Sequence, residues 1–163
     1  MRRSLLLLVL LVGACSSGSS HPQTAPTTPP PTTASAATKP AAPAFAVTTL
    51  SAATTFLSAD GNLACDIESA YARCDPKARA WSLPPQPTDC ASGWGHGIEI
   101  QAGTKASFFC GSDHITASRP LAAGHAFKVG FLECDAVNAS TVRCHDTGDA
   151  HGFTISKANY SLA

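Results

Sequence analysis

The densest group of potential metal ligands in the sequence is a seven-residue segment near its end. It contains two imidazoles and two carboxylates, at His145, Asp146, Asp149 and His151. A neutral imidazole nitrogen and a carboxylate oxygen are both suitable ligands for a divalent metal ion. The segment therefore supports the hypothesis of a small metal-dependent hydrolase. The alternative, which we favour, is a polar loop between two strands in which Asp and Gly form a turn and no cofactor is bound.

The candidate nucleophiles do not form a recognisable catalytic motif. Ser92, Ser112 and Ser118 all lie outside any Gly-x-Ser-x-Gly elbow. The run Ser112-Asp113-His114 contains the three residue types of a triad, but triads are assembled from separated segments. A glycine-rich phosphate-binding motif is also absent from the sequence. We therefore expect a binding module in preference to an enzyme.

Aromatic side chains suggest where such a module would bind. Trp94 and His96 lie in the glycine-rich segment 93–97, which we interpret as a flexible turn. An exposed tryptophan in a turn can stack on a sugar or on a partner protein. The alternative is that Trp81 and Trp94 cover the open ends of a sheet.

The charge balance argues against a nucleic-acid partner. The chain has 11 basic and 11 acidic residues, and its net charge is zero with neutral histidines. All of the acidic residues but only eight of the basic ones fall within 48–163, so this region has a net charge of −3. Electrostatic binding of nucleic acid needs a basic excess.

An internal repeat predicts how the cysteines pair. The pattern Gly-x-Leu-x-Cys-Asp occurs at 61–66 and again at 130–135, and each copy is followed by an apolar residue, Arg and Cys. Residues alternate around these cysteines as they do in strands. Each copy therefore predicts a β-hairpin with its own cross-strand bridge, since opposed residues lie within disulfide range. The predicted bridges are Cys65–Cys74 and Cys134–Cys144.

Cys90 and Cys110 remain for a third bridge. Between them, apolar stretches at 98–101 and 106–108 flank Gly103-Thr104-Lys105, which predicts a third hairpin. Six cysteines permit fifteen connectivities, so the pairing stays a hypothesis at this point. The sequence contains no C-x-x-C motif, which argues against zinc knuckles and thioredoxin-like chemistry.

The same region predicts an all-β fold. Large apolar residues are sparse between 48 and 163, turn-forming residues are frequent, and no amphipathic stretch is long enough for a substantial helix. Many short strands with frequent turns are typical of a sandwich or a small barrel. We expect an antiparallel sandwich or barrel built of hairpins and stapled by three disulfides.

The N-terminal third of the sequence predicts export and anchoring. Arg2 and Arg3 precede an apolar run at 5–12, which is typical of a signal peptide over 1–14. Val12-Gly13-Ala14-Cys15 resembles a bacterial lipobox, which implies that Cys15 is lipidated and anchors the chain in the membrane. Residues 15–47 are rich in Ala, Pro, Thr and Ser and predict a tether, followed by one disulfide-rich β domain over 48–163.

The β domain resembles a group of secreted or lipid-anchored actinobacterial proteins of the mycobacterial type. Their Phe-x-Ser-x-x-Gly-Asn-Ile-x-Cys start is similar to 56–65, and their Gly-His-Gly-Phe-x-Ile-Ser end is similar to 150–156, with Leu63 for isoleucine and Ala150 for glycine. Between these ends the matches include Arg73-Cys74-Asp75, Asp89-Cys90 and Phe109-Cys110. The resemblance implies an extracytoplasmic location and assigns no activity. We expect a cell-envelope lipoprotein that binds a cell-wall glycan, an envelope lipid or another exported protein.

Overall fold

The computed structural model describes residues 44–163, so the expected signal peptide, Cys15 and most of the expected tether lie outside the described residues. The first strand, β1 (Ala46–Leu50), begins inside the range assigned to the tether. Its threonines and valine suit an extended edge strand, and it pairs in parallel with β8 (His125–Val129) from Ala46 to Leu50.

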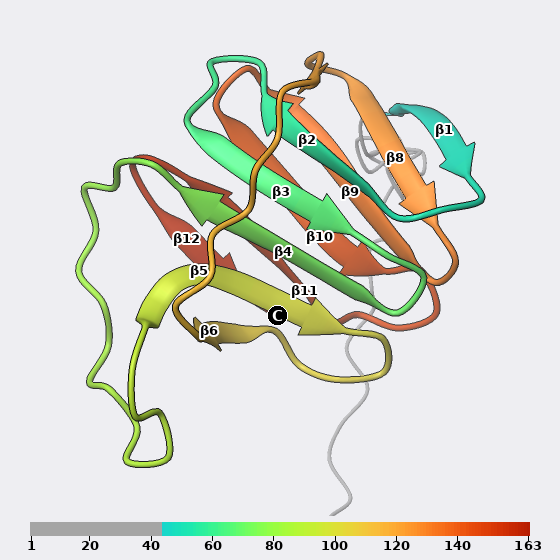
Figure 1. Cartoon of the computed structure of the whole chain (residues 1–163). Coiled ribbons are helices and arrows are strands. Elements are labelled where there is room, and N and C mark those ends of the chain that lie inside the picture. Colours follow the sequence, from blue (N-terminus) through green and yellow to red (C-terminus); the bar gives the residue numbers. More distant parts are fainter. Residues whose placement is uncertain (1–43) are drawn as a thin grey trace, which may run out of the picture. The chain divides into compact units, whose positions relative to one another are not determined.

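The described part of the chain is all-β, as predicted, and forms a sandwich of two six-stranded sheets (Figure 1). The remaining strands are β2 (Thr54–Ser58), β3 (Leu63–Ile67), β4 (Tyr71–Pro76), β5 (Trp94–Gln101), β6 (Ser107–Cys110), β7 (Pro120–Leu121), β9 (Leu132–Asn138), β10 (Thr141–Asp146), β11 (Gly152–Ser156) and β12 (Tyr160–Leu162). We call the sheet β1-β8-β9-β10-β11-β12 sheet A and the sheet β6-β5-β4-β3-β2-β7 sheet B.

The two sheets have the same topology. Sheet B contains the antiparallel meander β2 to β6, and sheet A contains the antiparallel meander β8 to β12. Each meander gains one parallel edge strand from the segment that precedes the other meander: β1 pairs with β8, and β7 pairs with β2. The domain is therefore two copies of one unit that exchange their first strands, which the hairpin repeat alone did not predict.

The three predicted disulfides are confirmed. Cys65 lies directly opposite Cys74 on β3 and β4, and Cys134 lies opposite Cys144 on β9 and β10. The third bridge joins Cys90 to Cys110, and the predicted third hairpin is β5–β6.

The apolar core lies between the sheets and follows the repeat. Phe56 on β2 is opposite Cys65, and Phe127 on β8 is opposite Cys134, so the two phenylalanines occupy equivalent places. Their rings meet edge to face at 5.5 Å in the centre of the sandwich. Both rings are almost fully buried, as are the two hairpin disulfides beside them.

The glycine-rich segment 93–97 is not the flexible turn that the sequence suggested, because β5 begins at Trp94. Gly97 serves close packing instead of a turn, since a Cβ placed there would lie 2.1 Å from Asp75 Oδ1. The same arrangement recurs at Gly152, where a Cβ would lie 2.8 Å from the carbonyl oxygen of Cys144. The His-Gly-apolar sequences at 96–98 and 151–153 are thus a further part of the repeat, because Ile98 lies opposite Cys74 and Phe153 lies opposite Cys144.

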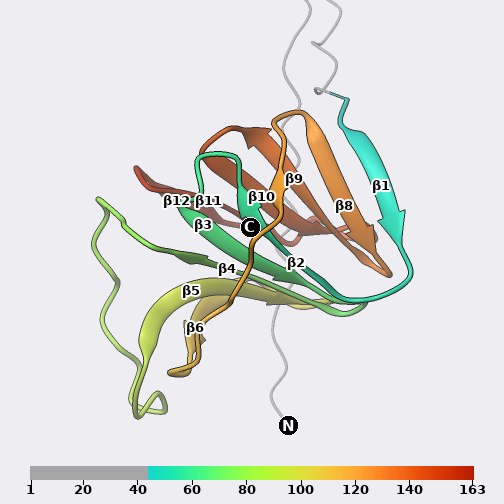
Figure 2. The same ribbon diagram turned by 45° about the horizontal axis from the view of Figure 1, so that its top comes forward.

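A strap, defined here as residues 111–119, connects β6 to β7 across the outer face of sheet B (Figures 1 and 2). It is the long orange segment that runs over β4 and β3 in Figure 1. The backbone of Leu57 in β2 donates to the carbonyl oxygen of Arg119 at 2.8 Å and secures the far end of the strap. The strap therefore covers part of a face that an open sandwich would leave to solvent.

Candidate functional site

The outer face of sheet B is organised around one buried cation, Arg73 on β4. Its Nε and Nη2 donate to the two carboxylate oxygens of Asp75 at 2.7 and 2.6 Å, and its Nη1 donates to Asp113 Oδ2 at 2.8 Å. The ring of Phe109 stacks on the guanidinium, with 3.4 Å between its centroid and Cζ. Burial opposes the charge, but the hydrogen bonds to Asp75 and Asp113 outweigh it and raise the pKa of Arg73. Arg73 is thus a satisfied buried ion that fastens the strap to the sheet.

Open space remains beside the strap at His114. A cavity of about 400 Å³ is lined by Asp75, Pro76, Lys77, Ala78, Arg79, His96 and His114. These residues come from the end of β4 and the segment after it, from β5 and from the strap. Three segments that are far apart in sequence therefore converge on one cavity, which we call the strap cavity.

The free polar groups of the strap cavity are mainly basic. The rings of His96 and His114 meet at 4.8 Å, and the side chains of Lys77 and Arg79 complete the basic part of the wall. The acidic wall residue, Asp75, has both oxygens bonded to Arg73, and its Oδ2 also accepts from the backbone of Ile115 at 3.2 Å. Permanent cations and imidazole N–H donors around a polar hollow suit an anionic ligand.

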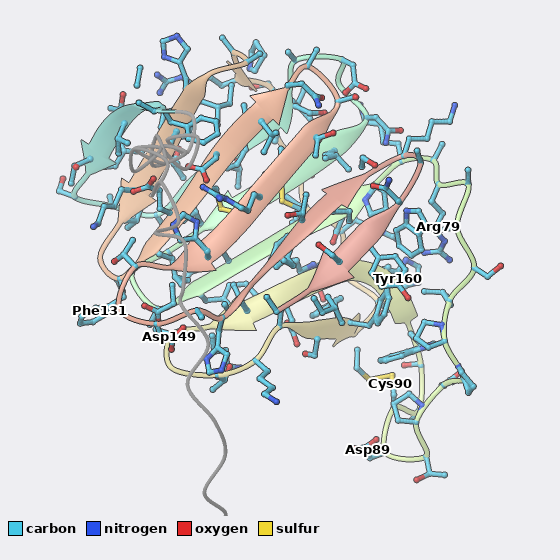
Figure 3. All side chains as sticks on the ribbon, turned by 180° about the vertical axis from the view of Figure 1, so that it is seen from behind. Arg79, Asp89, Cys90, Phe131, Asp149 and Tyr160 are labelled. Atoms are coloured by element: carbon cyan, nitrogen blue, oxygen red, sulfur yellow. A yellow bond between two sulfur atoms is a disulfide. The ribbon has the colours of Figure 1, made fainter. Side chains whose placement is uncertain are left out.

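Arg79 is held in place by two contacts. Its Nη1 donates to the carbonyl oxygen of Gly95, and its guanidinium lies 5.1 Å from the ring centroid of Trp81. Figure 3 shows Arg79 beside the sandwich edge, near Tyr160, while Asp89 and Cys90 lie at the tip of the long loop between β4 and β5. Arg79 therefore lies in the wall of the strap cavity with its guanidinium over the indole of Trp81.

Trp94 is not the exposed stacking residue that the sequence allowed. Its ring packs on Phe108 at 5.4 Å, and its indole Nε1 donates to the carbonyl oxygen of Pro84 at 3.1 Å. Trp81 packs on Phe108 at 6.0 Å from another side and on Tyr160 at 4.8 Å. Both tryptophans cover an edge of the core, because a domain with few apolar residues needs them there. Of the two weak binding candidates, His96 lines the strap cavity, whereas Trp94 packs on Phe108 and lines a separate cavity of about 340 Å³ beside the loop that carries Asp89 and Cys90.

The four residues proposed as metal ligands do not converge on one point. The carboxylate of Asp146 accepts from the backbone of Gly148 at 2.7 Å and of Gly103 at 2.8 Å, so it fixes two turns. Asp149 bonds to His151, with 3.0 Å between Oδ2 and Nδ1. The sequence hypothesis fails because residues alternate across a strand, which turns Asp146 away from His145. Asp149 stands at one end of sheet A in Figure 3.

His145 instead joins two carboxylates that the sequence did not single out. Glu133 and Asp135 on β9 and His145 on β10 are the one group of three potential metal ligands found among residues 44–163. Burial, together with the negative charge of the neighbouring Asp135, raises the pKa of Glu133. Burial also lowers the pKa of His145, which favours its neutral form. The hairpin predicted from the repeat could have revealed this group, because its register places Glu133 directly opposite His145.

Sequence reasoning also missed the strap cavity. The basic residues of the cavity come from three separate stretches of the sequence, and only the path of the strap brings His114 to His96. The sequence offered one signal, the adjacent carboxylate and imidazole at 113–114 shortly after Cys110. The run Ser112-Asp113-His114 does not form a catalytic triad, since the carboxylate of Asp113 bonds to Arg73.

Comparisons with protein-family models, with curated proteins and with solved structures find no match for this chain. Within the part of the chain that the structure describes, no helix has the length and apolar character needed to cross a membrane.

Proposed function

We propose that the chain is a lipid-anchored protein of the cell envelope whose β-sandwich binds an acidic glycan in the strap cavity. The lipobox-like sequence ending at Cys15 and the tether after it support the anchored, extracytoplasmic location. The three disulfides suit an oxidising compartment. The resemblance to secreted and lipid-anchored actinobacterial proteins points to the same location.

The observation that carries the binding proposal is the convergence of Lys77, Arg79, His96 and His114 on one cavity. Carboxylate or phosphate groups on a glycan match these donors in charge and in hydrogen-bonding capacity. Trp81 under Arg79 adds an aromatic edge to the rim. The four residues of the hydrolase hypothesis do not form a common ligand group among residues 44–163, so they give that function no support.

Binding is tested with defined glycans that carry uronic acid or phosphate groups and with neutral glycans of matched length. The full chain with oxidised disulfides is expected to bind the acidic series and to bind the neutral series more weakly. Lys77→Glu should lower the affinity roughly tenfold at low salt, since it reverses one charge at the rim. The matched control is Lys105→Glu in the β5–β6 turn, which should leave binding unchanged.

Two results would contradict the proposal. One is equal binding of acidic and neutral glycans, and the other is equal loss for the two charge reversals. Capture of an exported protein that is insensitive to Lys77→Glu would favour the alternative partner class.

The anchor is tested separately with Cys15→Ala. The unmodified chain is expected in the membrane fraction, and the variant is expected in the medium because it cannot receive a lipid. Retention of the variant in the membrane fraction would refute the lipidation of Cys15 without affecting the glycan proposal.

A further inference from the structure

The outer face of sheet A carries a second polar cluster, on the opposite side of the sandwich from the strap. Glu133 and Asp135 are two residues apart on β9, so both side chains leave the same face of the sheet. His145 lies directly opposite Glu133 on β10, and Arg143 lies opposite Asp135. One ligand atom from each of Glu133, Asp135 and His145 lies within 4.8 Å of the other two.

Two buried atoms of this cluster have no hydrogen-bond partner. Asp135 is fully buried, and its Oδ2 accepts from Nε and Nη2 of Arg143, whereas its Oδ1 accepts from no group. His145 Nδ1 is also buried and lies 3.6 Å from Asp135 Oδ2, too far for a hydrogen bond. Among the described residues that are not exposed, these are the two buried side-chain atoms without a partner. Buried polar atoms are satisfied in the great majority of cases, so two orphans at one spot point to a ligand.

The other copy of the repeat shows what is special about this cluster. The residues equivalent to Glu133, Asp135 and His145 are Ala64, Asp66 and Asp75. In that copy the arginine, Arg73, bonds to both oxygens of the aspartate that follows Cys74.

In sheet A a histidine follows Cys144, and a neutral imidazole cannot accept a forked pair of bonds from an arginine. Arg143 therefore reaches across to Asp135, and Glu133 adds a second carboxylate where the first copy has alanine. Two sequence differences between the copies, His145 for Asp75 and Glu133 for Ala64, thus place two carboxylates and an imidazole together where the first copy has the Arg73–Asp75 ion pair.

We propose that Glu133, Asp135 and His145 form a binding site for a divalent transition metal ion of the zinc type. Asp135 supplies Oδ1, His145 supplies Nδ1, and Glu133 supplies a carboxylate oxygen. The imidazole selects against Mg²⁺ and Ca²⁺, which prefer oxygen ligands throughout. Arg143 acts as a positioning residue, because it holds the second oxygen of Asp135 and fixes the orientation of the carboxylate.

The charges around the site limit its affinity. Lys128 on β8 lies opposite Glu133, and Arg143 on β10 lies opposite Asp135, so two cations already face the two carboxylates. A divalent ion therefore adds uncompensated positive charge. Removing the charge of Lys128, which is not a ligand, should strengthen metal binding. His145 also lines a cavity of about 210 Å³ with Arg143, Asp149 and Thr154, which leaves room for a small ligand beside the ion.

The test is calorimetric titration of the full, untagged chain with Zn²⁺, after chelator treatment and with the disulfides oxidised. We expect one Zn²⁺ per chain, and Mg²⁺ should bind more weakly by about tenfold or more, because the imidazole ligand does not suit it. Glu133→Gln and His145→Gln should each weaken Zn²⁺ binding by about tenfold or more. Imidazole nitrogen signals in nuclear magnetic resonance spectra should show that Zn²⁺ shifts His145 among the six histidines.

The matched control is His96→Gln, which removes an imidazole of the strap cavity on the other sheet. It should bind Zn²⁺ as the unmodified chain does. Lys128→Gln keeps the proposal testable if a ligand variant fails to fold, since this variant should bind Zn²⁺ more tightly than the unmodified chain does. Absence of Zn²⁺ binding would overturn the proposal, and so would a Zn²⁺-shifted imidazole other than His145. Binding that Glu133→Gln and His145→Gln leave unchanged would mark an adventitious ion only.

Discussion

The sulfur atoms of Cys74 and Cys144 lie 3.9 Å apart in the core, although the two residues are 70 positions apart in sequence. They belong to different disulfides, one from each copy of the repeated hairpin. The two bridges therefore pack against each other across the sandwich, beside the edge-to-face pair of Phe56 and Phe127. Each copy of the unit contributes the same residue types to the middle of one core, and neither sheet can bury this face alone.

Removing one hairpin disulfide should destabilise the domain strongly. Replacing Cys134 and Cys144 by alanine removes a bridge that closes a short loop, which the chain-entropy model values at about 3 kcal/mol. Both residues are fully buried, so the change also leaves a cavity against the other bridge. We expect a large fall in the free energy of unfolding, measured with urea under oxidising conditions.

The control is the pair Cys90→Ala and Cys110→Ala. This bridge closes a longer loop, with a sequence separation of 20 against 10, but Cys110 is exposed and the bridge lies at the domain edge. Loop entropy alone predicts a slightly larger loss for this pair. If core packing dominates, removing the buried Cys134–Cys144 bridge lowers the free energy of unfolding more than removing Cys90–Cys110. A larger loss of stability for the Cys90 and Cys110 variant would contradict that view.

Adding a methyl group at either repeated glycine should disturb the site next to it. In Gly97→Ala the new Cβ meets Asp75 Oδ1 and the carbonyl oxygen of Cys74, so the carboxylate must move away from its bonded position. In Gly152→Ala the new Cβ meets the carbonyl oxygen of Cys144 and the Cβ of His145. Overpacking of this kind costs about 1–3 kcal/mol.

Thermal unfolding of both variants and of Gly148→Ala checks this prediction. The nearest atom to a Cβ at Gly148 is Asp146 Oδ1 at 3.3 Å, so the control is expected to lose much less stability. A Gly97→Ala variant as stable as the Gly148→Ala variant would show that Asp75 is free to shift.

The cysteine repeat was enough to predict two hairpins with their bridges, because cross-strand disulfides follow directly from period-two alternation. The third hairpin followed from the apolar stretches around 103–105, and Cys90–Cys110 was the remaining pair. The exchange of β1 and β7 could not be predicted, since it depends on long-range parallel pairing with no local sequence signal. The segment 93–97 was misinterpreted because glycine serves both turns and close packing. At Gly97 the reason is the neighbouring Asp75, which lies 22 positions away in sequence.

The candidate site residues could also be predicted only in part. His145 was a correct choice of residue with the wrong partners, because proximity in sequence suggested Asp146 and Asp149 while the strand register provides Glu133. Arg73 attracted attention only as part of the repeat. Its burial could not be foreseen, since the carboxylate of Asp113 arrives from the strap, 40 positions later.

Trp94 should behave as a structural residue in substitution experiments. Trp94→Phe keeps an aromatic ring against Phe108 but loses the hydrogen bond to the carbonyl oxygen of Pro84, which costs about 1 kcal/mol. Trp94→Ala also removes the ring and should cost more, up to about 3 kcal/mol, because the ring is half-buried. Urea unfolding measures both. A Trp94→Ala variant of unchanged stability would return Trp94 to the list of free binding residues.

Acid should weaken the attachment of the strap to sheet B through protonation of Asp113. The hydrogen bond from Arg73 holds the pKa of the Asp113 carboxyl below its usual range near 4. The unfolded chain therefore binds this proton at a higher pH than the folded chain does. The contribution of Asp113 to stability is complete above about pH 4 and is lost as the pH falls through its folded pKa.

The difference in unfolding free energy between the unmodified chain and Asp113→Asn should consequently be largest near neutral pH and shrink below pH 4. Ser112→Ala, next to it in the strap, is the matched control and should show no such trend. The backbone amide of Ile115, which donates to Asp75 beside the same arginine, provides a local reporter. Its chemical shift should follow the protonation of Asp113 in the unmodified chain and lose that component in Asp113→Asn. A constant stability difference from pH 7 to pH 2.5 would mean that Phe109 and Asp75 hold Arg73 without help from the strap.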